Sequence, residues 1–467
     1  MDWPRVLATA LQEGGDWADV FWERTENCSL ETRQKTLQKM LTGYDEGIGI
    51  RVLHNSKTVY GYTNELSERA IMELARKISS AIHAERKDPY SRPQTLLQIH
   101  GAAPPQANSI HDSSLERKLS WVRELESTCW KLDSGVFQVG INWNDKTRKT
   151  FVFRSNGSYG HDEQNHLTVH TNVSGRSPTS EPCKTNHRFG GQYDWNKLDE
   201  YQPEALAKTL LKQLQTQYSA KPAPSGTMPV IIGGIAGGTL FHEAVGHGLE
   251  ADYACEGMST YSNKLGQQVA SELVTLIDDG SLSTLRGSQN IDDEGNRTQK
   301  NILIKNGKLE SYLVDQRMSI KTGLNPTGSG RRESYRHVPQ CRMSNTFVAE
   351  GNESAEKILR DTPWGLYVTE LGGGSVDIMS GDFVFAASEA FLIRGGEIGE
   401  AVRGATLTGN GPKVMLGIDR VGNDVGFEMG TCGKLGQWVP VTTGQPTLRI
   451  AQLTVGGVVP MSDYFSV

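Results

Sequence analysis

Two stretches in the first half of the chain carry apolar residues at helical spacing. In residues 71–82 the apolar positions recur every three or four residues, which predicts a helix with one buried face and Ser67 as its N-cap. In residues 206–214 leucines stand four apart, and Pro203 precedes them at a position suited to a first helical turn. Each pattern predicts an amphipathic helix packed on a sheet or on another helix.

Weaker signals predict two further helices and a run of strands. Asp2 can cap a short helix at the start of the chain. Residues 17–62 alternate between apolar and polar side chains in several places, which is typical of strands. Ser113 and Glu116 have the spacing of a capping box, so a helix is expected from there to about Leu132.

Alternating side chains predict three more strands before the chain reaches its middle. They cover residues 136–142, 149–154 and 166–173. Asn144 and Asp145 are turn-forming residues between the first two, and Asn156 with Gly157 precedes the third. The first half is therefore expected to mix helices with a sheet.

The pattern of predicted elements changes after a segment rich in proline, serine and glycine. Residues 221–226 have the composition of a linker, which divides the chain into domains of residues 1–220 and 227–467. Residues 230–233 then predict a buried strand, followed by a helix from about Thr239. The fold class expected is α+β: a mixed N-terminal domain, then a mostly β C-terminal domain that carries one functional helix.

Hairpin signals and glycine support the β character of the second half. Asn306 with Gly307, and Gly395 with Gly396, each separate two strand-like runs. The 51 glycines of the chain crowd into this half. Short strands joined by tight turns produce this pattern.

Composition and charge exclude several classes of function. With 467 residues, 37% hydrophobic and 22% charged, the chain is long enough for a large core and has no disordered or membrane character. A formal net charge of −6 disfavours nucleic acid as a partner. The longest central apolar stretch, residues 229–241, contains glycines and is too short to span a bilayer, and the N-terminus does not resemble a signal peptide, so a cytoplasmic location is expected. The six scattered cysteines are then expected to be free thiols or metal ligands.

The predicted helix near Thr239 contains His242, Glu243 and His247, in the pattern H-E-x-x-x-H. In the common zinc pattern H-E-x-x-H, the two histidines share a helix face and the glutamate acts as a base. Five residues of a regular helix turn through roughly 500°, which would leave these two imidazoles about 140° apart. We therefore predict a π-bulge or an early helix break between them, which the glycines on both sides of His247 would permit.

The motif alone leaves a plain alternative, in which these are polar residues on an exposed helix. The preceding strand, the glycine-rich corner and the absence of other charges up to Glu250 favour a metal site instead. A catalytic zinc takes three protein ligands. Glu250, Asp252 and Cys255 are local candidates for the third ligand, and the spacing does not choose between them and remote residues.

Several separated segments resemble one known family. HEAVGHGLEADY is similar to the metal-binding helix of the TldD subunit in the TldD/TldE (PmbA) zinc metalloprotease family. GIGIRVLHNSKTVYGYTNELS, GDFVFAASEAFLIRGGEIGEAVRGATL and MGTCGKLGQWVPVTTGQPTLRI resemble its N-terminal, later β and C-terminal segments, in the family's order. The segment DYACEGMSTYS is less basic than its equivalent in the common bacterial members, so the resemblance implies the metal site but not the family's substrate preference.

The resemblance implies a site, a cofactor and partners. It implies that His242, His247 and Cys432 bind Zn²⁺, and that Glu243 is the general base that activates the attacking water. The implied activity is hydrolysis of unfolded or extended peptides by a catalytic, TldD-type subunit. The implied partner is a TldE/PmbA-like paralogous subunit in a heterodimer, or a second copy of the chain.

Two other functions stay open from the sequence. A non-enzymatic modulator would bind a protein partner and use the metal only for structure, with a closed ligand set. A zinc hydrolase of small amides would have a chamber too narrow for a peptide. The residues that stabilise an oxyanion are not assigned, although Tyr335 and His337 are polar residues of a strand-like segment.

Overall fold

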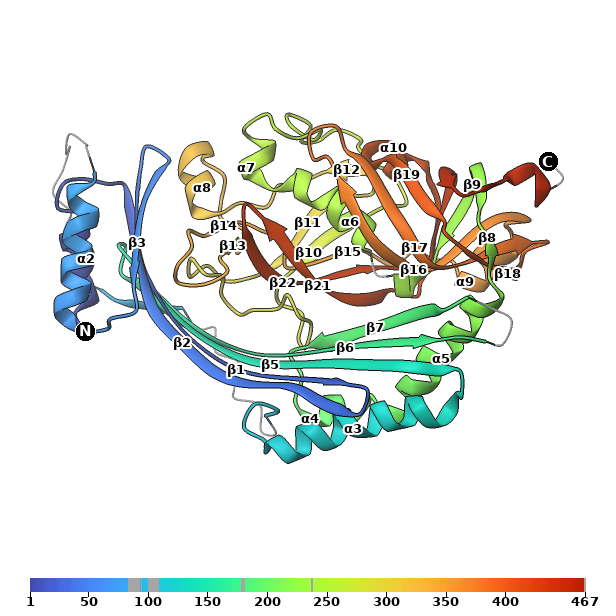
Figure 1. Ribbon diagram of the computed structural model, residues 1–467. Coiled ribbons are helices and arrows are strands. Elements are labelled where there is room, and N and C mark those ends of the chain that lie inside the picture. The colour runs from blue at the N-terminus through green and yellow to red at the C-terminus, as the bar shows by residue number, and fades with distance from the viewer. Residues whose placement is uncertain (83–92, 94, 100–108, 178–180, 237, 466–467) are drawn as a thin grey trace.

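A long, curved N-terminal sheet holds the C-terminal half of the chain on its concave side (Figure 1). The structure is a computed structural model, and it describes the chain except for residues 83–92, 94, 100–108, 178–180, 237 and 466–467. No helix among the described residues is both long and apolar enough to span a membrane. The predicted α+β class, with a mostly β second half, is confirmed.

The N-terminal sheet has seven strands in the order β3-β2-β1-β5-β6-β4, with β7 paired to β6. Its strands are β1 (Trp17–Arg33), β2 (Thr36–His54), β3 (Lys57–Thr63), β4 (Leu97–Ile99), β5 (Val136–Arg154), β6 (Ser158–Gly175) and β7 (Cys183–Gly191). The helices of this half are α1 (Trp3–Ala10), α2 (Glu68–Ser80), α3 (Leu115–Leu132), α4 (Trp195–Leu198) and α5 (Pro203–Ser219).

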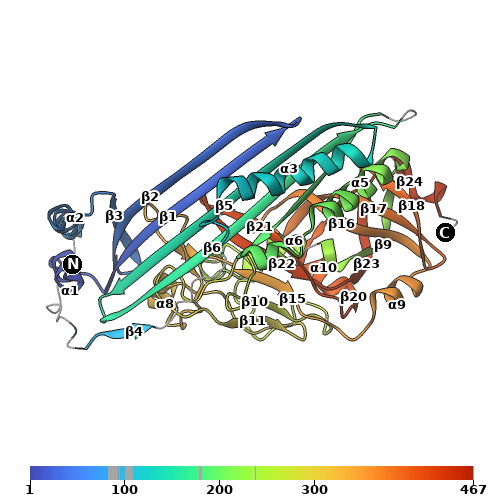
Figure 2. The same ribbon diagram turned by 90° about the horizontal axis from the view of Figure 1, so that it is seen from below.

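The predicted helices form and cover the outer face of this sheet. Helices α3 and α5 cross it side by side (Figure 2), while α1 and α2 pack at its other end. Asp2 and Ser67 cap α1 and α2 as predicted. Leu206, Leu210 and Leu214 of α5 are buried in one core with α3 and the sheet, because their spacing places them on one face.

Two sequence predictions in this half are wrong. Ser114, not Ser113, caps α3, with its Oγ accepting from the backbone N–H of Arg117. Asn144 and Asp145 form no turn, because β5 runs unbroken through them. The Asp145 carboxylate accepts hydrogen bonds from Trp143 Nε1 at 2.7 Å and from Lys118 Nζ at 3.0 Å, so α3 and the strand itself satisfy it.

The C-terminal half is built on two larger sheets around one core. A six-stranded sheet has the order β12-β11-β10-β15-β22-β21, and a nine-stranded sheet has β16-β9-β23-β19-β17-β18-β8 with β20 and β24 attached. The strands are β8 (Lys221–Pro222), β9 (Pro224–Ile232), β10 (Leu276–Asp279), β11 (Lys300–Lys305), β12 (Lys308–Leu309), β13 (Gly330–Arg331), β14 (Gln340–Cys341), β15 (Asn345–Val348), β16 (Trp364–Val376), β17 (Asp382–Arg394), β18 (Glu397–Arg403), β19 (Thr406–Asn410), β20 (Ile418–Val421), β21 (Gly426–Lys434), β22 (Gln437–Gln445), β23 (Leu448–Gly456) and β24 (Val459–Pro460). The helices are α6 (Thr239–Ala244), α7 (Ala251–Ala254), α8 (Gln316–Thr322), α9 (Ala355–Arg360) and α10 (Gly411–Gly417), with short 3₁₀ turns η1 (Gly234–Ala236), η2 (Gly246–Leu249) and η3 (Met461–Asp463).

The two hairpin turns that the sequence predicts in this half are present. Asn306 and Gly307 have φ of 47° and 79°, and they join β11 to β12 as predicted. The two-glycine turn at Gly395 joins β17 to β18. Residues 221–226, which the sequence suggests as a linker, instead lie in β8 and β9 of the nine-stranded sheet. The division into residues 1–220 and 227–467 stays a prediction.

Buried contacts join the two halves. Arg148 of β5 donates to Asp293 at 2.9 Å, and Arg51 of β2 donates to Glu294 at 2.6 Å. A Cβ at Gly47 would lie 2.1 Å from the Tyr335 ring, so this glycine allows the C-terminal half to approach the sheet closely. These contacts hold the concave face of the N-terminal sheet against the body that carries the candidate site.

Candidate metal centre

The helix that carries the histidine motif ends between its two histidines. Helix α6 stops at Ala244, Val245 leaves helical geometry with φ −128° and ψ −53°, and the 3₁₀ turn η2 begins at Gly246. The His242 and His247 ring centroids consequently lie 5.2 Å apart with an interplanar angle of 82°. The early helix break predicted from the spacing is confirmed, and it turns two imidazoles toward one point.

The distant Cys432 meets both histidines. It lies on β21, and its Sγ is 3.2 Å from Nε2 of His247. One ligand atom from each of His242, His247 and Cys432 lies within 4.8 Å of the others. The three side chains are 2%, 4% and 3% exposed in that order, so the group is shielded from bulk water.

These residues fit a bound zinc ion. Imidazole nitrogen and thiolate sulfur are both common zinc donors, and three protein ligands leave one position open. Both ring nitrogens of His242 are buried without a hydrogen-bond partner among the described residues, which is costly unless another group satisfies them. Although burial acts to raise the pKa of the Cys432 thiol, the facing histidines lower that pKa well below its ordinary value. The thiolate form that a metal requires is thereby favoured.

A buried acid orients His247. Nδ1 of His247 lies 3.0 Å from Glu250 Oε2, which leaves Nε2 facing Cys432. A carboxylate on the second ring nitrogen fixes the tautomer and the ring orientation of a metal-binding histidine. Burial acts to raise the pKa of Glu250, but Lys434 and His247 together lower it to about 2. Glu250, one of the local candidates for third ligand, thus supports a candidate ligand instead.

Lys434 is a residue that the sequence analysis missed. It lies two positions after Cys432 on β21 and therefore on the same face. Its ammonium donates to Glu250 at 2.9 Å and to Asp252 at 2.7 Å, with 2% of its side chain exposed. The i, i+2 spacing from Cys432 was a usable signal once β21 had been recognised as a strand. Cys255, the remaining local candidate for third ligand, is exposed.

We expect Lys434→Met to lower the free energy of unfolding by about 3 kcal/mol, because the loss of one partner leaves two buried carboxylates without their cation. Urea unfolding of the metal-free protein measures this loss without a contribution from metal affinity. Lys357→Met is the matched control, since Lys357 forms two ion pairs on the surface and its loss should leave stability nearly unchanged. Equal losses in the two variants would contradict the structural role of Lys434.

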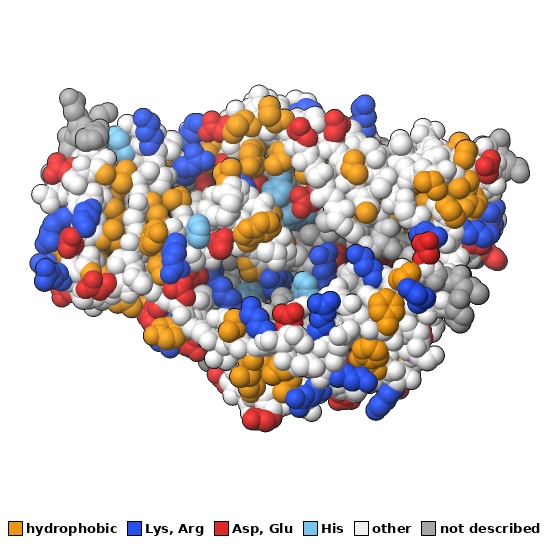
Figure 3. Space-filling view, in the orientation of Figure 1, with side chains coloured by type: hydrophobic (Ala, Val, Ile, Leu, Met, Phe, Trp, Pro, Cys, Tyr) orange, Lys and Arg blue, Asp and Glu red, His pale blue; other side chains and the backbone are white. Residues whose placement is uncertain are grey.

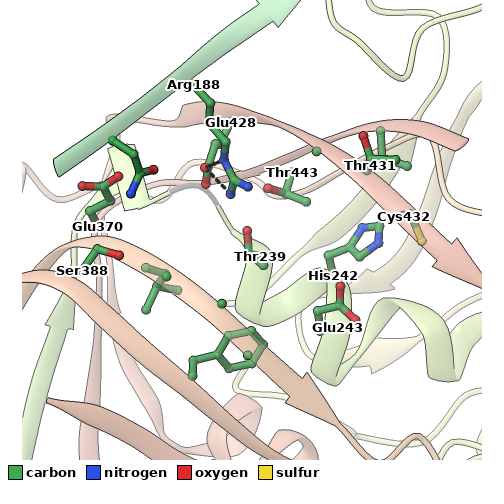
Figure 4. A pocket seen from close by; sticks show the side chains of 18 residues that line it. Arg188, Thr239, His242, Glu243, Glu370, Ser388, Glu428, Thr431, Cys432 and Thr443 are labelled. Carbon is green, nitrogen blue, oxygen red and sulfur yellow. Dashed lines mark hydrogen bonds and ion pairs between the residues drawn. The ribbon is translucent and has the colours of Figure 1, made fainter. Parts of the chain in front are cut away.

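A cavity of about 340 Å³ opens beside the three candidate ligands. Figure 4 shows His242, Glu243 and Cys432 on one side of it, with the Arg188–Glu428 ion pair and Glu370 on the other. The Glu243 carboxylate lies 3.9 Å from His247 Nε2, and its side chain is 33% exposed. Tyr335 lies elsewhere, in a small cluster with residues of the N-terminal sheet. The accessible carboxylate of Glu243 therefore lies between the buried candidate ligands and the open cavity.

Comparisons with known proteins cover most of the chain. Sequence profiles of the PmbA/TldA metallopeptidase domain 1, central domain and C-terminal domain match residues 18–84, 108–218 and 225–457. The Metalloprotease TldD homolog of Haemophilus influenzae is 33% identical over 95% of this chain and 93% of its own length. The Zinc metalloprotease TldD homolog of Saccharolobus solfataricus is 25% identical over 97% of this chain and 100% of its own length.

A solved structure shares the fold. The crystal structure of TldE from Thermococcus kodakarensis superposes with a TM-score of 0.77 at 18% identity, covering 97% of this chain and 99% of the other. At this identity the likeness establishes the fold alone. The profiles and the Haemophilus relative establish more: the chain belongs to the PmbA/TldA metallopeptidase family.

Proposed function

We propose that the chain is a TldD-like zinc metallopeptidase that hydrolyses unfolded or extended peptides. The observation that carries the proposal is the convergence of His242, His247 and Cys432 within 4.8 Å, with His242 and Cys432 at the wall of an open cavity. The names of its relatives, which include metalloproteases and a zinc metalloprotease, agree with this activity.

The donor set supports zinc as the metal and a catalytic role for it. His242, His247 and Cys432 would hold Zn²⁺, which supplies Lewis-acid polarisation of a carbonyl and lowers the pKa of water when it is bound. With two neutral imidazoles and one thiolate, three ligands leave a fourth position for water or substrate. Glu250 keeps His247 in the tautomer that directs Nε2 toward the centre.

Glu243 is proposed as the general base. Its carboxylate, 3.9 Å from His247 Nε2 and open to the cavity, can accept a proton from a water molecule at the centre. It would then carry that proton to the leaving amine. The cavity walls from β16 and β21 would hold the peptide near these groups.

The proposal includes a cytoplasmic location and a partner. A TldE/PmbA-like paralogous subunit, or a second copy of the chain, would complete a chamber around the peptide. The fold that the chain shares with TldE agrees with pairing between related subunits.

Hydrolysis of an unstructured fluorogenic peptide tests the proposal, with the chain alone and with a paralogous subunit from the same genome. We expect turnover that falls at least about 100-fold after zinc is removed by a chelator and that returns on addition of Zn²⁺, because the metal provides several kcal/mol of transition-state stabilisation. Chelator saturated with zinc beforehand is the control.

Two outcomes would contradict this proposal. Equal turnover by metal-free and zinc-loaded protein would exclude the metal from catalysis. Cleavage of small amides such as amino-acid anilides, with no cleavage of the peptide by either preparation, would identify a small-amide hydrolase instead.

A further inference from the structure

A second cavity, of about 190 Å³, lies between the concave face of the N-terminal sheet and strands β21 and β22. Cationic and histidine side chains dominate its lining: Lys146, Arg148, His166, Arg286, Arg331 and Arg332. Figure 3 shows blue side chains and histidines gathered along the hollow between the two halves of the molecule. Only Asp293 and Glu333 contribute carboxylates to the described lining.

The protein's own carboxylates do not neutralise this cavity. Asp293 already accepts from Arg148 at 2.9 Å and from the backbone N–H of Arg332 at 2.8 Å. Glu333 accepts from the backbone N–H of Trp438 at 2.9 Å. Glu333 keeps its negative charge, which acts to raise the pKa of Lys146, so five cationic side chains of the lining face two carboxylates.

Three cations of the lining form no ion pair among the described residues. Arg286 donates to the Gly430 carbonyl and to Thr431 Oγ1, and Arg331 donates to two backbone carbonyls. Lys146 has no ion pair within the part of the chain that the structure describes, and the same holds for Arg286 and Arg331. Arg331 is buried, and Lys146 and Arg286 are half-buried. Removing a cation from water without an ion-pair partner is costly, so these groups are expected to serve a ligand.

Burial supports the interpretation that these side chains serve a ligand. Burial lowers the pKa of Arg286 and of Arg331 to about 10 in each case, and it also lowers the pKa of Lys146. Arg148 Nη2 and His166 Nδ1 line the same cavity and are buried without a hydrogen-bond partner among the described residues. Both residues are more than nine-tenths buried. Because His166 Nε2 donates to Gln164, Arg148 Nη2 is the unused donor beside this cavity.

The cationic cavity adjoins the candidate metal centre. Thr431 lines both cavities, and it directly precedes Cys432 on β21. Arg286 donates to Gly430 and Thr431, which connects the two spaces through one strand. The two cavities therefore lie next to each other along β21.

We propose that the cavity around Lys146, Arg286 and Arg331 is a subsite that binds a carboxylate of the peptide substrate. This inference rests on the proposed function and adds a substrate preference to it. A volume of about 190 Å³ suits one small group rather than a polyanion, and the overall net charge of −6 disfavours a nucleic acid. Guanidinium and ammonium donors form strong charge-assisted hydrogen bonds with carboxylates.

Equilibrium binding tests the subsite without turnover. The host is the full chain carrying Glu243→Gln, and fluorescence anisotropy follows three labelled peptides of one unstructured sequence. One ends in a free carboxylate, one in an amide, and one in an amide with a single internal glutamate. We expect either acidic peptide to bind about tenfold more tightly than the neutral one. The acidic peptide that binds more tightly shows whether the subsite prefers the C-terminal carboxylate or a glutamate side chain.

Lys146→Met removes one cation that makes no ion pair, so the fold should be retained. We expect this substitution to reduce the tenfold affinity advantage of the acidic peptides over the neutral peptide to below about threefold. Binding of the neutral peptide should stay unchanged. Lys149→Met, on the same strand but with half of its side chain exposed, should keep the full advantage. Equal binding of acidic and neutral peptides by the host, or an undiminished advantage in Lys146→Met, would overturn the subsite.

Bromide provides a readout that does not depend on peptidase activity. Crystals soaked in sodium bromide should show anomalous density between Lys146 and Arg286, and crystals of Lys146→Met should lack it. Absence of that density in the unmodified chain would overturn the subsite. Zinc-loaded chain that prefers acidic peptides but cleaves none of them would contradict the proposed function alone.

Discussion

Cys432→Ser is expected to lower peptide hydrolysis by about 1000-fold and to reduce bound zinc from one ion per chain to a small fraction. The Cys432 sulfur lies 3.2 Å from His247 Nε2 and is the only anionic member of the three candidate ligands. A serine hydroxyl is a poor zinc ligand at neutral pH. A catalytic zinc ion supplies several kcal/mol to the transition state, and each 1.4 kcal/mol is about tenfold in rate. Loss of the proposed ion therefore predicts this effect on turnover.

Elemental analysis of the purified protein measures the zinc, and the fluorogenic peptide measures turnover. Cys255→Ser is the matched control, because Cys255 is an exposed cysteine of the same half and should change neither quantity. Full zinc occupancy in Cys432→Ser, with unchanged hydrolysis, would remove Cys432 from the proposed centre.

Glu243→Gln is expected to keep the zinc and to lower the rate of hydrolysis by about 10²- to 10⁴-fold, the usual contribution of a general base. The amide has nearly the same size as the carboxylate, so the cavity and the three candidate ligands should be preserved. The Glu243 carboxylate is 3.9 Å from His247 Nε2 but is not one of the three ligand groups. The substitution therefore separates metal binding from proton transfer.

Single-turnover hydrolysis and zinc content are compared with those of Glu272→Gln, an exposed glutamate of the same half. The control should match the unmodified chain in both measurements. Hydrolysis by Glu243→Gln at the rate of the unmodified chain would show that another group accepts the proton.

Local patterns identified most of the helices because each has a strong periodic or capping signal. The helix starting after Ser67 and the helix from Pro203 are both present with the expected buried faces. The predicted turn at Asn144 and Asp145 failed for a physical reason. Lys118 of α3 donates to the Asp145 carboxylate at 3.0 Å, and this long-range contact outweighs the local turn preference.

The spacing of His242 and His247 predicted a π-bulge or an early helix break between them, because a regular helix cannot turn two residues five positions apart toward one ion. The sequence also identified Glu243 as the carboxylate beside those histidines, from adjacency in the motif. The family resemblance implied Cys432 as a distant ligand, but the spacing of residues could not choose the distant groups that meet the histidines. Cys432, Lys434 and the cationic cavity depend on the register of β21 against its neighbours, and contacts between residues far apart in the chain leave no periodic signal in the sequence.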